Sequence, residues 1–206
     1  MRHFYHTFYL LAFLNLLSSG VSGTGIQDMG PYDKLRVLTV ELQASLENNY
    51  DPEREEVVAA EIDKILAENE ISDTLLLSDA HFLVGVTLLN KSRYLQALDR
   101  LSLSAKLRKL KNIRDRRYAS SLSNMAIIWL KMGDYPQALE IGKEAMKFKR
   151  EVIGSDSSSL ASNYLNLSSI YLELNDSKKA IAAAEAGLVL SGASQGRVSA
   201  SVTADL

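Results

Sequence analysis

The sequence contains no cysteine, so it can form no disulfide bond and offers no thiolate to a metal ion. Histidine is almost as scarce, because His81 is the only one apart from His3 and His6 near the start of the chain. Such a chain has no thiol nucleophile, little histidine to act as a general base, and few ligands for zinc. We therefore expect a protein that is not an enzyme and that uses no cofactor and no metal ion.

Residues that interrupt helices are also few. Three prolines and eleven glycines are spread over 206 residues, of which 47% are apolar. This composition is typical of a helical globular protein and unlike that of a disordered chain. We expect an all-α fold that is stabilised by packing alone.

Long apolar runs are absent except near the start of the chain. Residues 1–23 contain Arg2, then an apolar stretch from Phe8 to Leu17, and then small residues up to Gly23. That stretch is too short to span a bilayer, and this order is typical of a secretory signal peptide. We predict an exported protein, periplasmic or secreted, with cleavage near Gly23 and no transmembrane helix. The alternative is an uncleaved amphipathic start.

Charge is distributed unevenly along the chain, although the net charge is only -2. Residues 41–79 hold twelve acidic and two basic residues, whereas residues 91–150 hold fifteen basic and five acidic ones. The chain is therefore a charge dipole along its sequence. Attraction between the acidic region of one copy and the basic region of another predicts self-association.

Two segments repeat one pattern of side-chain sizes. NMAIIWLKMGDYPQALEIGKEAM begins at Asn124, and NLSSIYLELNDSKKAIAAAEAGL begins 42 residues later, at Asn166. In both, apolar residues recur at the spacing of an amphipathic helix, a Gly-Asp or Asn-Asp turn follows, and a second helix begins after the turn. A single helical hairpin cannot bury its apolar face, so we expect stacked copies.

These units resemble the tetratricopeptide repeat, a helical hairpin whose pattern includes an aromatic residue, a Gly-Asp-Tyr-like turn and two alanines. The stretch GDYPQAL from Gly133 fits that turn closely, and an earlier copy includes Gly85, Tyr94 and Ala97. The step of about 42 residues exceeds the usual 34 and resembles the long-period subclass found in kinesin light chains. The resemblance implies an α-solenoid, a right-handed superhelical stack of hairpins, whose concave groove binds a protein or peptide partner.

The repeat phase divides the chain into four parts. The first two are the signal peptide, residues 1–23, and a degenerate or capping hairpin, residues 24–75, with helices expected at Tyr32–Asn48 and Pro52–Asn69. Residues 76–190 hold three repeats, at about 78–112, 119–153 and 161–190. Residues 191–206, which begin rich in Ser and Gly, are either a tail or the start of a further repeat.

Asparagine occupies the same place in the two clear repeats. The resemblance puts Asn124 and Asn166 on the concave surface, with Lys131 and Ser162 close by. An amide donates and accepts hydrogen bonds without charge, which suits the backbone of a bound peptide. The alternative is that the two amides satisfy neighbouring helix ends or face water.

Some co-chaperones of this fold clamp a terminal carboxylate with Lys and Arg on the same surface. Here Asp79 and Leu83 stand where part of such a clamp would lie. An acid and an apolar residue do not attract a carboxylate, so we do not expect a clamp.

A second candidate surface is the basic stretch from Lys106 to Arg117. It is either a solvated helix face or a docking patch for an acidic partner, and no aromatic residues alternate with the bases as nucleic-acid binding favours. We therefore expect no nucleic-acid partner. The seven bases are Lys106, Arg108, Lys109, Lys111, Arg114, Arg116 and Arg117.

Two single residues are assigned to packing. His81 and Trp129 both fall on apolar helix faces, where burial in the core is the simplest expectation. The leading functional hypothesis is an exported scaffold that binds a peptide in its groove. The alternative is the N-terminal sensor or interaction segment of a longer membrane signalling protein.

Overall fold

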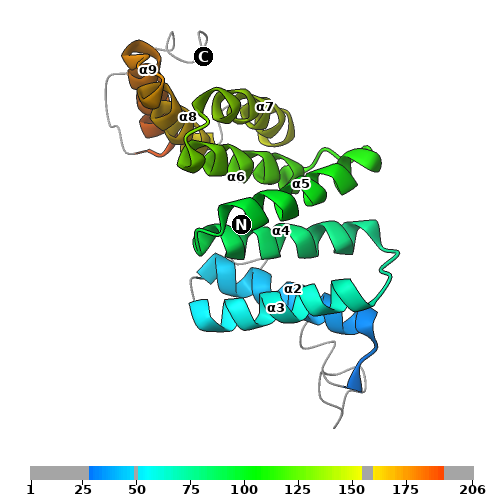
Figure 1. Cartoon of the computed structure of the whole chain (residues 1–206). Helices are drawn as coiled ribbons and strands as arrows, with labels where there is room; N and C mark the ends of the chain where they lie inside the picture. Colours follow the sequence, from blue (N-terminus) through cyan, green and yellow to red (C-terminus); the bar gives the residue numbers. More distant parts are fainter. Residues whose placement is uncertain (1–27, 49–50, 155–159, 193–206) are drawn as a thin grey trace.

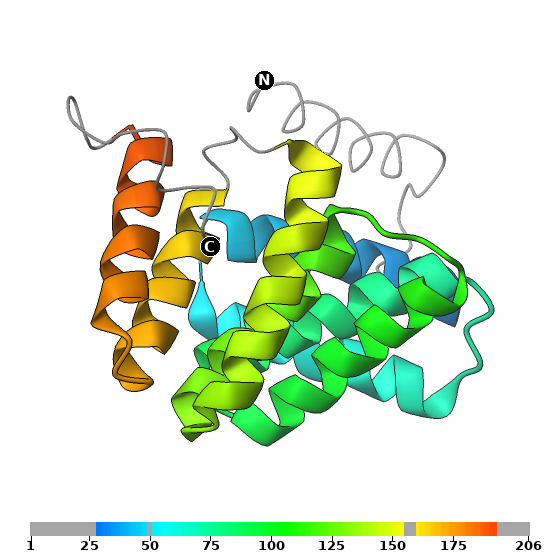
Figure 2. The ribbon, with the colours of Figure 1, turned by 90° about the horizontal axis from the view of Figure 1, so that it is seen from above.

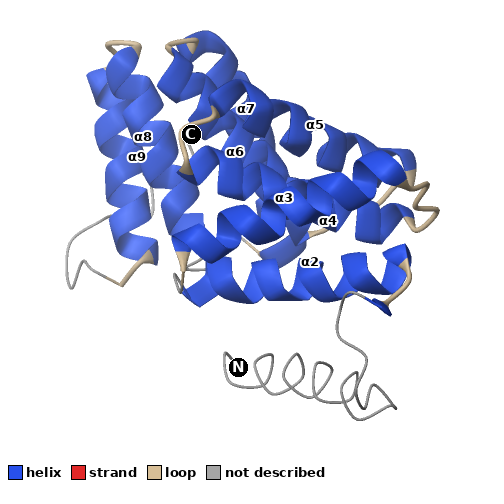
Figure 3. Ribbon diagram, turned by 60° about the horizontal axis from the view of Figure 1, so that its bottom comes forward, coloured by secondary structure: helices blue, strands red, loops and turns tan. Residues whose placement is uncertain are grey.

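The computed structural model describes residues 28–48, 51–154 and 160–192, and these residues form eight α-helices and no strand (Figures 1 and 3). Consecutive helices pair into four hairpins, which confirms the predicted all-α stack. The hairpins are α2 (Pro31–Asn48) with α3 (Pro52–Glu68), α4 (Thr74–Asn90) with α5 (Tyr94–Leu110), α6 (Arg116–Met132) with α7 (Tyr135–Ile153), and α8 (Ala161–Glu173) with α9 (Ser177–Leu190).

Helix starts follow from residues that are visible in the sequence. Pro31, Pro52 and Pro136 all lie in the first turn of a helix, where proline's missing N–H costs no hydrogen bond. Asp51 caps α3, because its carboxylate accepts hydrogen bonds from the backbone N–H groups of Glu53 and Arg54. The expected start of α3 is therefore confirmed.

The turns inside the last two hairpins have matching geometry. Gly133 has φ +85° and Asn175 has φ +58°, so both adopt the left-handed conformation that ends a helix. The aspartate that follows each of them, Asp134 or Asp176, then caps the next helix through its side chain. This explains why Asn-Asp can replace Gly-Asp between repeats.

Small residues let the helices of a hairpin approach closely. At Gly85 in α4, a Cβ atom would lie only 2.8 Å from Leu101 Cγ in α5. Ala126 in α6 and Ser168 in α8 occupy the same place in the next two hairpins and are both buried. The size of the side chain is therefore what the repeat preserves.

The core is divided into three clusters of buried side chains along the stack. Trp129, which we expected in the core, is only partly buried, and it packs at the junction of the second and third clusters. Its neighbour Ile128 is fully buried in the first cluster, which also contains α2 and α3. Each hairpin thus shares its core with the next one.

The first helices of successive hairpins, α2, α4, α6 and α8, contact one another along the stack. Figure 2 shows the last hairpin beside α7, at one end of the molecule. Within the described residues, no helix has the combination of length and apolar character needed to cross a membrane.

Candidate functional site

One side of α6 carries polar residues and faces away from α7. Ser120, Asn124, Ile127 and Lys131 follow at helical spacing along this side, and none of the four is fully buried. The residues 42 positions later in α8 are Ser162, Asn166, Ser169 and Glu173, and none of these is buried either. We call these eight residues the inner face.

A buried asparagine fixes the position of α8 against α6 and α7. The amide of Asn163 donates to Ser123 Oγ at 2.7 Å and accepts from Lys149 Nζ at 2.6 Å. Burial of Lys149, together with the nearby charge of Arg116, lowers the pKa of its ammonium group. Sequence reading did not single out Asn163, because nothing local distinguishes it from the asparagine three positions later.

This bridge places the two inner-face asparagines on adjacent helices of one surface. Asn124 directly follows Ser123, and Asn166 lies about one turn after Asn163. Both side chains are half-buried, and neither amide makes a hydrogen bond within the described residues. Two amides with free donors and acceptors therefore face the same side.

The remaining polar residues of the inner face differ between the helices. Lys131 and Ser162 are exposed, as a binding surface requires. Glu173, the counterpart of Lys131, interacts with the Tyr135 hydroxyl, and this hydrogen bond raises the pKa of Tyr135. The inner face therefore carries one positive and one negative side chain and has no strong charge preference.

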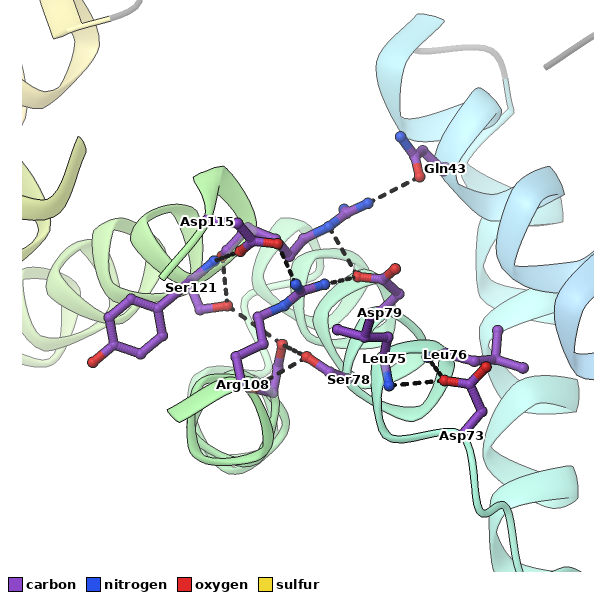
Figure 4. Close-up of polar contacts among 12 residues, drawn as sticks. Gln43, Asp73, Leu75, Leu76, Ser78, Asp79, Arg108, Asp115 and Ser121 are labelled. Atoms are coloured by element: carbon purple, nitrogen blue, oxygen red, sulfur yellow. Dashed lines mark hydrogen bonds and ion pairs between the residues drawn. The ribbon is translucent and has the colours of Figure 1, made fainter. Parts of the chain in front are cut away.

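Towards the N-terminal hairpin, the same side of the stack is already occupied by internal contacts (Figure 4). Asp79, the counterpart of Ser120 in α4, binds the guanidinium of Arg108 and lies 3.2 Å from Arg117 Nε. Arg117 also donates to Gln43 Oε1 at 3.0 Å and stacks over the Phe82 ring. Arg108 and Arg117 are therefore both committed to contacts within the stack.

The basic stretch does not form a single exposed patch. Arg108 is 3% exposed and binds both Asp79 and Asp115, so its assignment to a docking patch is wrong. Arg117 makes the contacts with Asp79, Gln43 and Phe82 described above. Arg114 stacks over the Phe148 ring. The bases of the stretch that remain exposed without these contacts are Lys106, Lys109, Lys111 and Arg116.

A different basic site lies between α7 and α8. A pocket of about 370 Å³ has three bases on α7, Lys143, Lys147 and Arg150, above a floor that includes Tyr164 and Leu167. Arg150 donates to the Tyr164 hydroxyl. The bases follow one another at i, i+4 and i+7, a spacing that the sequence already contained and that would have revealed a basic helix row.

A larger pocket, of about 520 Å³, lies among α3, α4 and α5. Four of its charged residues are paired with one another, because Lys91 binds Glu56 at 3.3 Å and Arg100 binds Asp63 at 3.0 Å. Neither pocket includes the inner-face asparagines. The described residues also contain no cluster of metal-ligating side chains.

His81 is buried, as expected, at the side of α4 that contacts α5. Arg100 in α5 donates to its Nδ1 at 3.2 Å. Burial and the Arg100 charge lower the pKa of His81 to about 4, so the ring is neutral at physiological pH. Its burial and its contact with Arg100 agree with a role in packing.

Comparison with known proteins identifies the repeat. Residues 117–188, which span α6 to α9, match the profile of the tetratricopeptide repeat family. The last two hairpins are therefore tetratricopeptide repeats. A comparison with curated proteins finds no significant match in sequence.

Solved structures show the same tetratricopeptide-repeat fold beyond the matched residues. A Podosopora anserina putative kinesin light chain with nearly identical TPR-like repeats superposes with a TM-score of 0.61 at 12% identity, over 79% of this chain and 76% of that one. One structure of MamA gives a TM-score of 0.55 at 13% identity, over 77% and 79% of the two chains. A second MamA structure covers 94% of this chain and 97% of its own, with a TM-score of 0.54 at 13% identity. At such identities the likeness concerns the fold.

The solved structures that resemble this protein include kinesin-light-chain-like repeats, as the long repeat step predicted. Tetratricopeptide repeats are scaffolds for contacts between proteins, so the fold indicates a protein partner. Which surface of the array binds that partner is a separate question, because function depends on the site rather than on the fold.

Proposed function

We propose that this protein is an exported scaffold that binds an extended protein segment across the inner faces of α6 and α8. The observation that carries the proposal is the pair of half-buried amides, Asn124 and Asn166, which have no partner within the described residues. An extended backbone presents N–H and C=O groups along its length, and an asparagine amide pairs with both. Two such amides on adjacent helices would fix the register of a bound segment.

The chemistry of the surrounding residues favours recognition of backbone over recognition of charge. Ser120 and Ser162 add hydroxyl groups beside the two amides, and Ile127 adds an apolar contact. Lys131 is the one base of the inner face, so it is the residue expected to contact an acidic side chain of the segment. The one acid and the one base of the inner face nearly cancel in charge, which predicts that binding depends weakly on salt.

The double substitution Asn124→Ala with Asn166→Ala tests this proposal. Each lost amide should cost about 1–3 kcal/mol of binding free energy, because a polar group of the segment is left buried and unpaired. We expect the dissociation constant to rise well over tenfold. The measurement is calorimetric titration of a peptide selected on the wild-type protein from a displayed library.

Two variants serve as controls for that measurement. Asn163→Ala removes a buried bridge and should lower the free energy of unfolding by about 1–3 kcal/mol, whereas the double variant should unfold at nearly the wild-type midpoint. Glu140→Ala, on the exposed side of α7, should change neither property. Undiminished binding by the double variant would refute the inner-face proposal. If that binding also weakened with salt, the exposed lysines Lys106, Lys109 and Lys111 would become the better candidates.

Export is the second part of the proposal and concerns residues 1–23, which lie outside the described residues. We expect the mature protein to begin near Thr24, and intact-mass measurement of protein from its native host tests this. Leu14→Arg should block processing, because a charge interrupts the apolar stretch that export requires. Recovery of the wild-type protein with Met1 retained would contradict export.

Self-association through the acidic residues 41–79 and the basic residues 91–150 stays a prediction. Several of the charges that it requires are paired inside one chain, including Glu56 with Lys91 and Asp63 with Arg100. These internal pairs leave fewer charges for contact with a second copy.

A further inference from the structure

An apolar surface is open at the end of the stack formed by α8 and α9. Its large side chains, Leu165, Leu172, Ile181 and Leu188, are 44%, 57%, 58% and 45% exposed. Leu165 lies against Gly187, the neighbour of Leu188, so the two helices form one continuous surface. We call these four residues the end face. An exposed apolar surface of this kind usually marks an interaction site.

In the preceding hairpin, the residues equivalent to the end face are covered by the next hairpin. Leu130, Leu139 and Met146 stand 42 residues before Leu172, Ile181 and Leu188. All three pack into one cluster with side chains of α8, and Met146 is only 4% exposed. The end face therefore has the chemistry of an interface between hairpins, without a hairpin against it in the described residues.

The opposite end of the stack is different. The outer side of α3 exposes Glu53 and Lys64, with Val57 as its one exposed large apolar residue among the described residues. Charged residues suit an end that faces water, and apolar residues do not. Within the described residues the two ends are therefore unlike, and the end formed by α8 and α9 has the apolar character of a covered surface.

We propose that the end face is covered by the end face of a second copy of this chain, in a two-fold symmetric dimer. A two-fold contact requires a surface that is complementary to itself. On the exposed side of α9, Lys178, Ile181, Glu185 and Leu188 follow at the 3-4-3 spacing that forms a seam between paired helices. Neither Lys178 nor Glu185 forms a salt bridge within the described residues.

The order of charges on α9 makes this seam complementary to itself. The midpoint between Lys178 and Glu185 falls between Ile181 and Ala182. If two copies of α9 pack antiparallel about that midpoint, each Lys178 faces Glu185 of the other copy, and the two Ile181 side chains lie together at the centre. A parallel arrangement would instead oppose like charges, which weakens association.

The dimer would double the binding surface of the scaffold. Each copy keeps its own inner face, so one dimer presents two, and a partner with two segments would bind more tightly than a partner with one. The end face contributes no residue to the inner face. Failure of either proposal therefore leaves the other intact.

Sedimentation-velocity measurements over a range of protein concentrations test the dimer. We expect Ile181→Glu to raise the dimer dissociation constant by more than about tenfold, because the substitution places two carboxylates at the centre of the contact. Lys178→Glu and Glu185→Lys should each weaken the dimer. The double variant Lys178→Glu with Glu185→Lys should restore it, because the two charges only exchange places.

Matched surface variants separate this contact from other forms of association. Leu95→Glu, at an exposed leucine on α5, and Val57→Glu, at the opposite end, should leave the dimer unchanged. Weakening by Val57→Glu would indicate head-to-tail stacking and overturn the proposal. A wild-type protein that stays monomeric at all concentrations would overturn it as well. So would association that appears only after residues 193–206 are removed, since that segment would then be what covers the end face.

Discussion

Arg108→Ala is expected to lower the free energy of unfolding by about 3–5 kcal/mol, the usual cost of removing one partner from a buried ion pair. Arg108 is 3% exposed, and its guanidinium joins Asp79 in α4 to Asp115 at the start of α6. Without it, Asp115 loses its counter-ion, Asp79 keeps only Arg117, and α5 loses its ion pairs with α4 and with the start of α6. Urea denaturation followed by the fluorescence of the single tryptophan measures the loss.

A second variant shows whether the geometry of the guanidinium matters. Arg108→Lys keeps the charge, but a single ammonium cannot donate in the same fork to both carboxylates, so we expect a smaller but clear loss. Lys106→Ala, two residues earlier and exposed, should change stability by no more than about 0.5 kcal/mol. An unfolding midpoint for Arg108→Ala equal to that of Lys106→Ala would mean that the Arg108 contacts contribute nothing to stability.

The sequence could not identify Arg108 as a core residue. It lies among exposed lysines in one basic run, and its partner Asp79 is 29 positions earlier in the chain. The pairing arises only when α4, α5 and α6 meet, where Ser78, Ser104 and Ser121 also form hydrogen bonds (Figure 4). Local periodicity gives the buried side of a helix, but it does not say which charge will be neutralised there.

The hairpins themselves were predictable, because their signals are local. Asp51-Pro52 marks the start of α3, and Gly133 and Asn175 mark turns that require a left-handed residue. The repeat step of 42 residues then implied the stacking, since equivalent apolar stripes must cover one another. Side-chain size at a few spaced positions was sufficient for this part of the fold.

The candidate site was only partly predictable. The repeat phase puts Asn124 and Asn166 at equivalent positions, and both side chains are half-buried. The same phase could not say that Asn163 is the structural asparagine, since its partners Ser123 and Lys149 come from two other helices. Whether an amide is satisfied inside the fold depends on neighbours that are distant in sequence.

The fold brings part of the acidic region of the chain next to part of the basic region. Acidic α3 lies against α4 and the α4–α5 turn, so Glu56 and Asp63 reach Lys91 and Arg100. Each of these pairs is partly exposed and contributes little alone. Part of the charge dipole seen along the sequence is therefore cancelled between neighbouring hairpins.

Acidification from pH 7 to pH 4 should destabilise the protein by up to about 3 kcal/mol through His81 alone. Its pKa is lowered from 6.5 to about 4 in the folded chain by burial and by the Arg100 charge. The unfolded chain therefore binds more protons than the folded one between these values. The stability contribution is complete above pH 6.5 and is lost as the pH falls to about 4.

Other charged groups near His81 also change stability with pH, so the contribution of His81 must be measured against a variant. Arg100 donates to the ring from α5 and also pairs with Asp63 of α3, whose own pKa is raised by its burial. A carboxyl with a raised pKa is stabilising when protonated, so Asp63 opposes part of the loss at low pH. The informative quantity is thus the difference between wild type and His81→Gln, which keeps an acceptor for Arg100 but cannot titrate.

That difference in unfolding free energy should vary with pH only between about 6.5 and 4. It should shift in favour of the variant as the pH falls. His81 is the only histidine after residue 23, so one imidazole resonance in the NMR spectrum of the processed protein reports its protonation directly. Titration of that resonance near pH 6.5 would show that the ring is solvated. In that case the stabilities of wild type and variant would change with pH in parallel. That result would refute the lowered pKa of His81, because desolvation by burial is its main cause.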